Sequence, residues 1–266
     1  MNNTGSSRQP GWFTFFERKP DAKLRLFCFP YGGGGLSAFS DWAASMPPGV
    51  ELAVMELPGR GQRFSEPLMH DMSVIIERMA NEFISYIDKP YVFFCHSLGA
   101  FLGFELMQAL RRRDVSLPKL FMVAGMRAPQ FEVENQLHSL DDDAFLIALD
   151  QYNGTPANIL ANRELMNLYL PIFRADFSLS EKYQYRPSKP FNLPFIFMGG
   201  RDDHTVREVE SDGWQLHSER PIVQKFFPGD HFFLFNEGKT AVLSTLASSL
   251  RQVMADGLLP EWSVSA

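Results

Sequence analysis

The chain has 266 residues, of which 45% are hydrophobic and 21% charged, and its formal net charge is −6. A chain of this length and composition buries enough apolar surface to fold without disulfides, which excludes a disordered, collagen-like or disulfide-scaffold protein. The acidic balance argues against a nucleic-acid-binding protein, because such proteins need a basic face to neutralise phosphates. No apolar run reaches the ~18 residues that cross a membrane, and the N-terminus lacks the apolar core of a signal peptide.

The predicted elements alternate between apolar strands and amphipathic helices along most of the chain. Residues 1–20 are polar and are expected to form an irregular N-terminal arm. The strands are expected at 24–29, 49–57, 91–95, 119–124, 193–198 and 222–227, and helices at 72–88, 98–113 and 240–254. Because the strands are continuously apolar, both faces of the sheet should be covered by helices. The pattern predicts an α/β fold with a mostly parallel sheet, in a single domain over residues 21–258.

A long stretch from about residue 132 to 190 interrupts this alternation. It contains helical patterns but no clear strand, and it is too long for a plain loop in a compact domain. We therefore expect a helical insertion that acts as a cap. Its aromatic and aliphatic residues either pack the insertion itself or line a cavity, and the pattern does not separate these two roles.

The two cysteines of the chain, Cys28 and Cys95, each lie within an apolar run. Buried free thiols that pack as small hydrophobic groups are favoured over a disulfide. This usage fits a reducing compartment, and we expect a cytoplasmic protein. No cluster of His, Cys or acidic residues has metal-ligand spacing, so neither a metal nor another cofactor is expected.

The segment Cys95-His96-Ser97-Leu98-Gly99 lies between a predicted strand and a predicted helix. It matches the nucleophile elbow, G-x-S-x-G, in which a tight turn exposes a serine hydroxyl at the carboxyl edge of a sheet. Small residues two positions before and after the serine let the strand and helix backbones approach, so Cys95 in place of glycine predicts slight crowding. Two alternatives stay open: Ser97 as an ordinary helix N-cap, and Cys95 as the nucleophile.

A nucleophilic serine needs a base and an acid that orients the base, and with this elbow the chain order is serine, acid, histidine. His231 follows the last predicted strand in a glycine-containing loop and is the predicted base. The acid is expected after the preceding strand, where Asp202 and Asp203 compete. We favour Asp203, because the spacing of Gly200, Asp203 and Val206 places it at the bend of the loop.

The negative charge of a tetrahedral intermediate needs backbone N–H donors, the oxyanion hole. One donor is expected from Leu98, the residue after the serine, and the other from the glycine-rich loop 31–35 after the first strand. Gly32 is the first choice in that loop and Gly33 the second. The loop is not a P-loop, since no Gly-Lys-Ser/Thr follows, and it lacks the G-x-G-x-x-G spacing of a dinucleotide-binding loop.

Further motifs, in the same order along the chain, resemble those of the type II, or editing, thioesterases of nonribosomal peptide and polyketide synthesis. The resemblance extends from about residue 24 to 250. Besides the elbow, it rests on FPYGGG at 29–34, ELPGRGQR at 56–63, LP at 170–171, RADF at 174–177 and GDHF at 229–232. The chain departs from the family at Cys95, where glycine is usual, and at Gly32, where alanine is usual.

The resemblance implies an α/β-hydrolase fold whose helical insertion is a lid. It implies a serine thioesterase that removes acyl or aminoacyl groups from the phosphopantetheine arm of acyl or peptidyl carrier proteins, as a monomer and with no cofactor of its own. Two alternatives are an esterase of small free esters or acyl-CoA, and an inactive module that binds acylated carriers. Arg60, Arg63 and the arginines at 111–113 are candidates for carrier docking or, alternatively, structural charges.

Overall fold

The computed structural model describes residues 11–133, 136–152, 154 and 162–256. Within these residues, seven strands form one sheet in the order β1-β3-β2-β4-β5-β6-β7. The pairs from β3 to β7 are parallel, and β1 alone runs antiparallel to its neighbour β3. The strands are β1 (Phe13–Phe15), β2 (Leu24–Phe29), β3 (Val50–Met55), β4 (Tyr91–His96), β5 (Phe121–Ala124), β6 (Phe195–Gly200) and β7 (Val223–Phe227). The mostly parallel sheet predicted from the sequence is confirmed.

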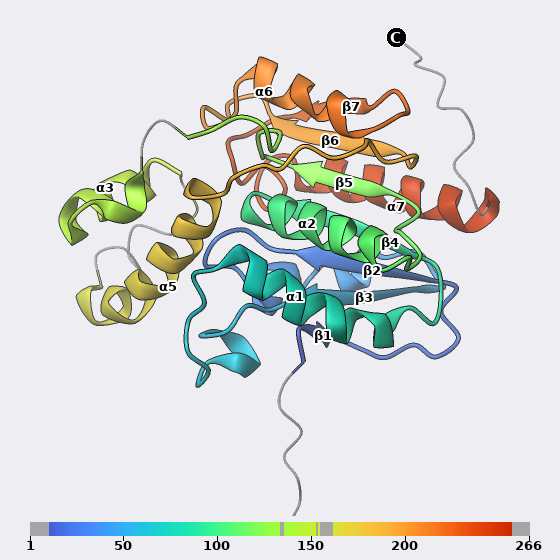
Figure 1. Ribbon diagram of the computed structural model, residues 1–266, viewed down its shortest axis with the longest axis horizontal. Coiled ribbons are helices and arrows are strands. Elements are labelled where there is room, and N and C mark those ends of the chain that lie inside the picture. The colour runs from blue at the N-terminus through green and yellow to red at the C-terminus, as the bar shows by residue number, and fades with distance from the viewer. Residues whose placement is uncertain (1–10, 134–135, 153, 155–161, 257–266) are drawn as a thin grey trace, which may run out of the picture.

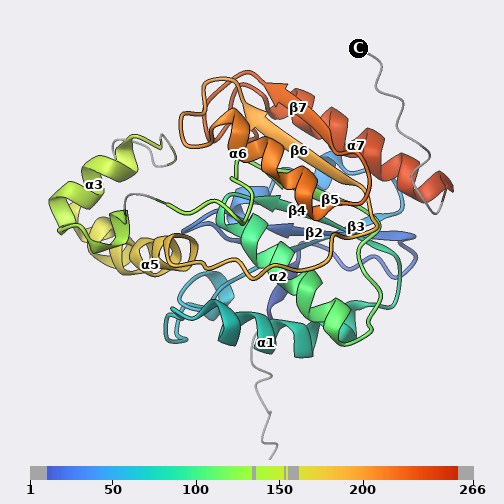
Figure 2. The same ribbon diagram turned by 45° about the horizontal axis from the view of Figure 1, so that its top comes forward.

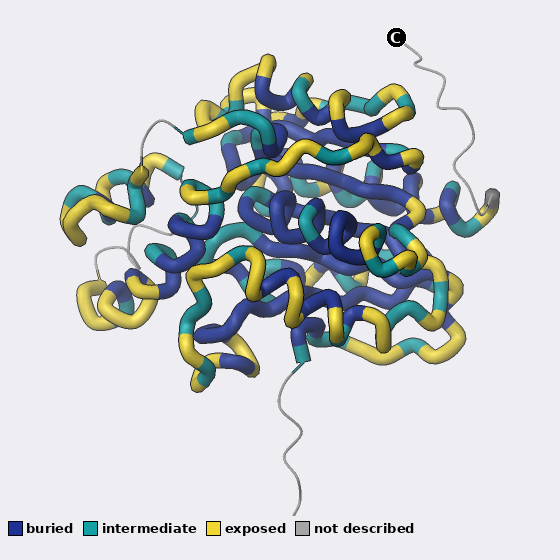
Figure 3. Tube along the Cα trace, in the orientation of Figure 1, coloured by how far each residue is buried: buried dark blue, intermediate teal, exposed yellow. Residues whose placement is uncertain are grey.

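Helices cover both faces of this sheet, as the continuously apolar strands predict (Figures 1 and 2). The helices are α1 (Met72–Phe83), α2 (Leu98–Arg112), α3 (Asp142–Asp150), α5 (Arg163–Glu181), α6 (Glu208–Asp212) and α7 (Lys239–Asp256). One large apolar cluster joins α1 and α2 to one face, and a second joins α7 to the other. Strands β2 to β6 are therefore buried along their whole length and form the interior of the molecule (Figure 3).

The N-terminal segment requires a correction, because residues 13–15 form β1 instead of part of an irregular arm. Trp12 and Phe13 are buried, and Phe13 pairs with Met55 of β3. A three-residue strand is too short to give a periodic hydropathy signal, and its stability comes from a partner some 40 positions away. Residues 1–10 lie outside the described residues.

Helices α3 and α5 stand apart from the helices that cover the sheet (Figures 1 and 2). Both fall in the stretch 132–190, whose described residues contain helices and no strand. The two helices share a small apolar cluster of their own, formed by Phe145 and Leu149 of α3 and Met166 and Leu170 of α5. We call α3 and α5 the lid helices.

Candidate active site

Ser97 occupies the sharp turn between β4 and α2, with φ 53° and ψ −124°. A positive φ is uncommon for a residue with a side chain, and a backbone in such a region costs about 1–3 kcal/mol that the surrounding structure must offset. The Ser97 N–H donates to the carbonyl of Ala124 on the neighbouring strand at 2.9 Å. The Ser97 side chain makes no helix-capping hydrogen bond, so the geometry is that of an elbow and not of an ordinary N-cap.

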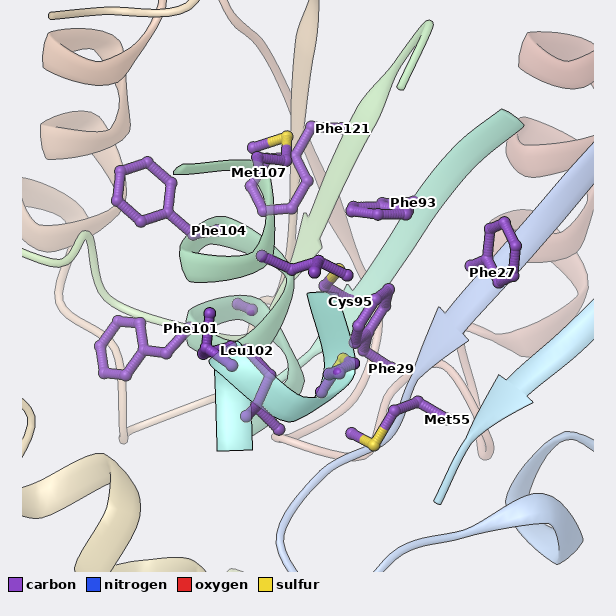
Figure 4. Close-up of a cluster of buried hydrophobic side chains, with 14 of the residues drawn as sticks. Phe27, Phe29, Met55, Phe93, Cys95, Phe101, Leu102, Phe104, Met107 and Phe121 are labelled. Atoms are coloured by element: carbon purple, nitrogen blue, oxygen red, sulfur yellow. The ribbon is translucent and has the colours of Figure 1, made fainter. Parts of the chain in front are cut away.

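Small residues are needed at the elbow because α2 approaches the neighbouring strands closely there. A Cβ added to Gly99 would lie 2.2 Å from the carbonyl oxygen of Phe29, so no side chain fits there. The Cys95 side chain packs in the same buried cluster as Phe29 (Figure 4). A Cβ at Gly103 of α2 would lie 2.5 Å from Cys95 Sγ, so Gly103 supplies the space that Cys95 fills. Burial raises the pKa of the Cys95 thiol, which makes it unsuited to act as a nucleophile.

The structure brings Ser97, His231 and Asp203 together from three distant parts of the chain. His231 Nε2 lies 3.0 Å from Ser97 Oγ, and His231 Nδ1 lies 3.0 Å from Asp203 Oδ2. Burial alone would raise the pKa of Asp203, but hydrogen bonding to His231, the charge of that ring and the bonds from Thr205 outweigh it, so the pKa is lowered. The carboxylate therefore stays ionised next to the imidazole. Asp202 is exposed, and it is Asp203 that contacts the histidine.

Thr205 is a residue of this site that the sequence analysis missed. Its hydroxyl lies 2.6 Å from Asp203 Oδ1 and 2.9 Å from His231 Nδ1, and its N–H donates to the same carboxylate oxygen at 2.9 Å. Because a carboxylate only accepts, the hydroxyl proton goes to Asp203, and Oγ1 is left to accept from His231 Nδ1. A threonine two residues after an aspartate occurs in many ordinary loops, so the sequence holds no distinctive signal for this role.

His96 holds the backbone of His231, a contact that the sequence analysis also did not predict. It is fully buried, and its Nε2 lies 2.9 Å from the carbonyl oxygen of His231, so this nitrogen carries the proton. Among the described residues its Nδ1 has no hydrogen-bond partner. Burial, with the nearby His231 ring, lowers the pKa of His96 to about 3, so the ring stays neutral while it holds the His231 backbone.

The predicted oxyanion donors, Gly32 and Leu98, both line a cavity that also contains Ser97 and His231. Leu98 is the first residue of α2, where a backbone N–H has no partner within the helix and the helix dipole favours negative charge. The N–H of Gly33, the second choice, donates to Asp176 Oδ2 at 2.6 Å. That bond commits the Gly33 N–H elsewhere and leaves Gly32 as the better candidate of the two.

The cavity has a volume of about 910 Å³ and lies between the Ser97 side and the lid. The aromatic rings of Tyr152 and Phe177 form part of the cavity wall on the lid side. Several charged side chains also line it, namely Arg127, Glu132, Asp150, Asp176, Glu181, Arg207 and Glu210. Such a chamber has room for an extended acyl group and offers polar as well as apolar contacts.

Two of the candidate docking arginines are structural. Arg60 is buried and forms an ion pair with Asp176 of α5. Arg63 is also buried, pairs with Glu66 at 2.7 Å and lies over the ring of Trp12 at 4.0 Å. Neither guanidinium is on the surface, so the suggestion that they dock a carrier is wrong.

Comparisons with known proteins agree with this geometry. The model of the thioesterase domain family matches residues 24–250. The chain belongs to the thioesterase family. It is 38% identical to the gramicidin S biosynthesis protein GrsT of Aneurinibacillus migulanus over 245 residues, which cover 92% of this chain and 95% of GrsT.

Solved structures extend the comparison to the fold. This thioesterase superposes on BorB, the type II thioesterase of the borrelidin biosynthetic cluster, with a TM-score of 0.82 at 28% identity, over 92% of this chain and 100% of BorB. The superposition on RedJ, the thioesterase of the prodiginine pathway of Streptomyces coelicolor, has a TM-score of 0.81 at 30% identity, over 85% of this chain and 90% of RedJ. The α/β-hydrolase fold and the resemblance to type II thioesterases are thereby confirmed, and the protein is a thioester hydrolase.

Two further properties bear on the site and its surroundings. Within the described residues, no group of three or more His, Cys, Asp or Glu side chains is placed to hold a metal ion. In the same part of the chain, no helix combines the length and the apolar character needed to cross a membrane.

Proposed function

We propose that this thioesterase hydrolyses acyl or aminoacyl thioesters on the phosphopantetheine arms of carrier proteins, and so clears groups that stall a synthase. One observation carries the proposal: in a chain that matches type II thioesterases, Asp203, His231 and Ser97 form a hydrogen-bonded relay that opens into a cavity walled by the lid. The side chains and backbone N–H groups of this chain supply the catalytic groups of the proposed reaction, and no cofactor enters the scheme.

In the first half-reaction, Ser97 Oγ attacks the thioester carbonyl carbon while His231 Nε2 takes the hydroxyl proton. The carbonyl oxygen becomes an oxyanion, which the N–H groups of Gly32 and Leu98 bind. The intermediate then collapses, the C–S bond breaks, and the acyl group stays on Ser97. The proton on His231 Nε2 passes to the sulfur of the departing thiolate, so the ring is neutral again for the next step. A thiol of pKa about 8.5 is a good leaving group and needs little help from the histidine to depart.

In the second half-reaction, His231 removes a proton from water, which attacks the acyl-serine ester. The second tetrahedral intermediate collapses, the free acid leaves, and His231 returns the proton to Ser97 Oγ. Throughout, Asp203 and Thr205 hold the Nδ1 proton of the imidazole, so that Nε2 is the nitrogen free to act as the base.

The lid helices control access of the substrate to this site. Residues of α3, α5 and their flanks form the cavity wall opposite Ser97, so movement of the lid helices would gate the pantetheine arm and its cargo. We propose that the carrier docks as a transient partner of a thioesterase that acts as a monomer in the cytoplasm.

A survey of substrates tests the proposal, with Ser97→Ala as the control. Hydrolysis of acyl-loaded carrier proteins is compared with that of the corresponding acyl-CoA and oxygen esters, and the acyl-carrier thioesters should be preferred in kcat/KM. Faster hydrolysis of free oxygen esters by orders of magnitude would indicate an esterase instead. Carrier binding with no turnover above that of Ser97→Ala would indicate an inactive binding module.

A further inference from the structure

A buried ion pair joins the lid helix α5 to Arg60, and its carboxylate also contacts the glycine-rich loop 31–35, which we call the oxyanion loop. This ion pair has no role in the reaction steps above. Asp176 of α5 is 1% exposed and accepts hydrogen bonds from both terminal nitrogens of the Arg60 guanidinium. The same carboxylate accepts the backbone N–H of Gly33 at 2.6 Å. Burial of two charges is costly, so an ion pair at this place is not explained by stability alone.

The backbone that Asp176 contacts is a β-turn made mostly of glycine. The N–H of Gly34 donates to the carbonyl of Tyr31 at 2.9 Å, and Gly33 at the third position has φ +81°, as a type II turn requires. A type I turn differs mainly by a flip of the central peptide between Gly32 and Gly33. Because both central residues are glycines, sterics alone do not select one turn over the other.

Asp176 discriminates between these two orientations. In the observed turn, the N–H of Gly33 points to the carboxylate and forms a charge-assisted hydrogen bond. After a flip, the carbonyl oxygen of Gly32 would face the same carboxylate, and two electronegative atoms would repel each other. Arg60 binds the same carboxylate through both terminal nitrogens of its guanidinium and so fixes its position.

Side chains of the lid helix α5 also pack closely against the oxyanion loop. A Cβ at Gly33 would lie 2.1 Å from the ring of Phe173, and one at Gly32 would lie 3.4 Å from Asp176 Cβ and 3.8 Å from the Phe177 ring. Phe173, Asp176 and Phe177 are spaced three and four residues apart, so they form one face of α5. The oxyanion loop is thus shaped against the lid.

We propose that Asp176 is a positioning residue: its bond to the Gly33 N–H anchors the turn to α5 and so fixes the place of the adjoining Gly32 N–H in the cavity beside Ser97, and it makes a working oxyanion hole depend on α5 being in place. This inference rests on the proposed function only in the use of Gly32 as a donor. Donor positions matter within a few tenths of an ångström, because an oxyanion hole acts on the transition state at about 2.7–3.1 Å.

Three double variants separate the effect of the hydrogen bond from that of the charge. Arg60→Met with Asp176→Asn removes both charges but keeps an oxygen that accepts the Gly33 N–H. Arg60→Met with Asp176→Leu removes the charges and the acceptor at similar volume, and Arg60→Met with Asp176→Ala serves as a second non-acceptor if the leucine variant does not fold. The control is Asp142→Asn, which breaks the exposed Arg174–Asp142 pair within the lid.

We expect kcat of the non-acceptor variants to be about 10²-fold below that of the Asn variant, with KM changed less than about threefold, because one oxyanion donor is worth 10²–10³. Affinity for a trifluoromethyl ketone, whose adduct with Ser97 carries an oxyanion, should fall by a similar factor, and Asp142→Asn should behave as wild type. Equal kcat and equal inhibitor affinity in the acceptor and non-acceptor variants, at any level, would overturn the proposal.

The substrate of this comparison is a 4-nitrophenyl ester, so that the oxyanion hole is measured without a carrier. If the wild type hydrolyses such esters but no acyl-carrier thioester, the proposed function fails while the comparison at Asp176 is still decided. If it hydrolyses acyl-carriers and the variants do not differ, the proposed function stands and the role of Asp176 fails.

Discussion

Thr205 Oγ1 and Asp203 Oδ2 both lie within hydrogen-bond distance of His231 Nδ1, so in the proposed mechanism Nε2 is the nitrogen that acts as the base. The Nδ1 proton lies between Asp203 Oδ2 at 3.0 Å and Thr205 Oγ1 at 2.9 Å. The threonine also ties down the carboxylate through its hydroxyl and its backbone N–H. At this scale, catalytic competence depends on a few hydrogen bonds, each worth about 1.5–3 kcal/mol where a charged group takes part.

Thr205→Val should lower kcat/KM by roughly 10–100-fold, because it removes one hydrogen bond to the ionised Asp203 and one acceptor for His231. Thr205→Ser, which keeps the hydroxyl, should restore most of the activity. Steady-state hydrolysis of an acyl thioester measures both variants. If serine and valine at this position give the same loss, the hydroxyl has no positioning role.

Asp203→Asn should reduce kcat about 10³–10⁴-fold, since the amide favours the wrong tautomer of His231. Asp202→Asn is the matched control and should stay within about threefold of wild type, because its side chain is exposed. Single-turnover acylation by an activated ester gives the comparison. A large loss in Asp202→Asn with a small one in Asp203→Asn would reverse the assignment of the acid.

At the scale of elements, the elbow depends on how closely β4 and α2 approach. Gly99 lies against the backbone of β2, and Gly103 lies against Cys95 of β4. These two glycines, one helical turn apart, let α2 approach both strands closely. Cys95 is therefore tolerated in place of the usual glycine because α2 offers space opposite it. The strained backbone of Ser97 is held by this packing on both sides.

Gly103→Ala should destabilise the protein by about 1–3 kcal/mol, because the added Cβ would lie 2.5 Å from Cys95 Sγ in a packed core. The double variant Cys95→Ala with Gly103→Ala should recover most of that loss, since the two Cβ atoms would then be 3.8 Å apart. Urea denaturation measures the free energy of unfolding of each. A double variant no more stable than Gly103→Ala would show that the contact with the sulfur is not the cause.

For the whole molecule, several charged and titratable groups are buried. Arg60 and Asp176 form an internal pair, and His96 and His217 are buried as neutral rings. Burial lowers the pKa of His96 to about 3 and that of His217 to about 4. His96 and His217 therefore bind protons at a higher pH in the unfolded chain than in the folded protein.

Stability should fall as the pH drops from about 6.5 to 4, since in that range the two histidines are protonated in the unfolded state but not in the folded state. At about 1.4 kcal/mol per pKa unit, each contributes a loss of up to about 3 kcal/mol. His217→Gln removes one of them and should flatten the slope of unfolding free energy against pH. An unchanged slope in this variant would mean that His217 does not titrate as its burial implies.

The sequence by itself determined the features that have a local cause. Continuously apolar strands specified a sheet covered on both faces, and the strand-serine-helix context together with the glycine loop before His231 predicted Ser97 as the nucleophile and His231 as the base. Only the tertiary structure showed which of Asp202 and Asp203 contacts His231, because adjacent side chains diverge and the path of the loop selects the one that lies against the imidazole. It alone revealed β1 and the place of Arg60, since the stabilising partner of each lies far away in sequence, on β3 and on α5.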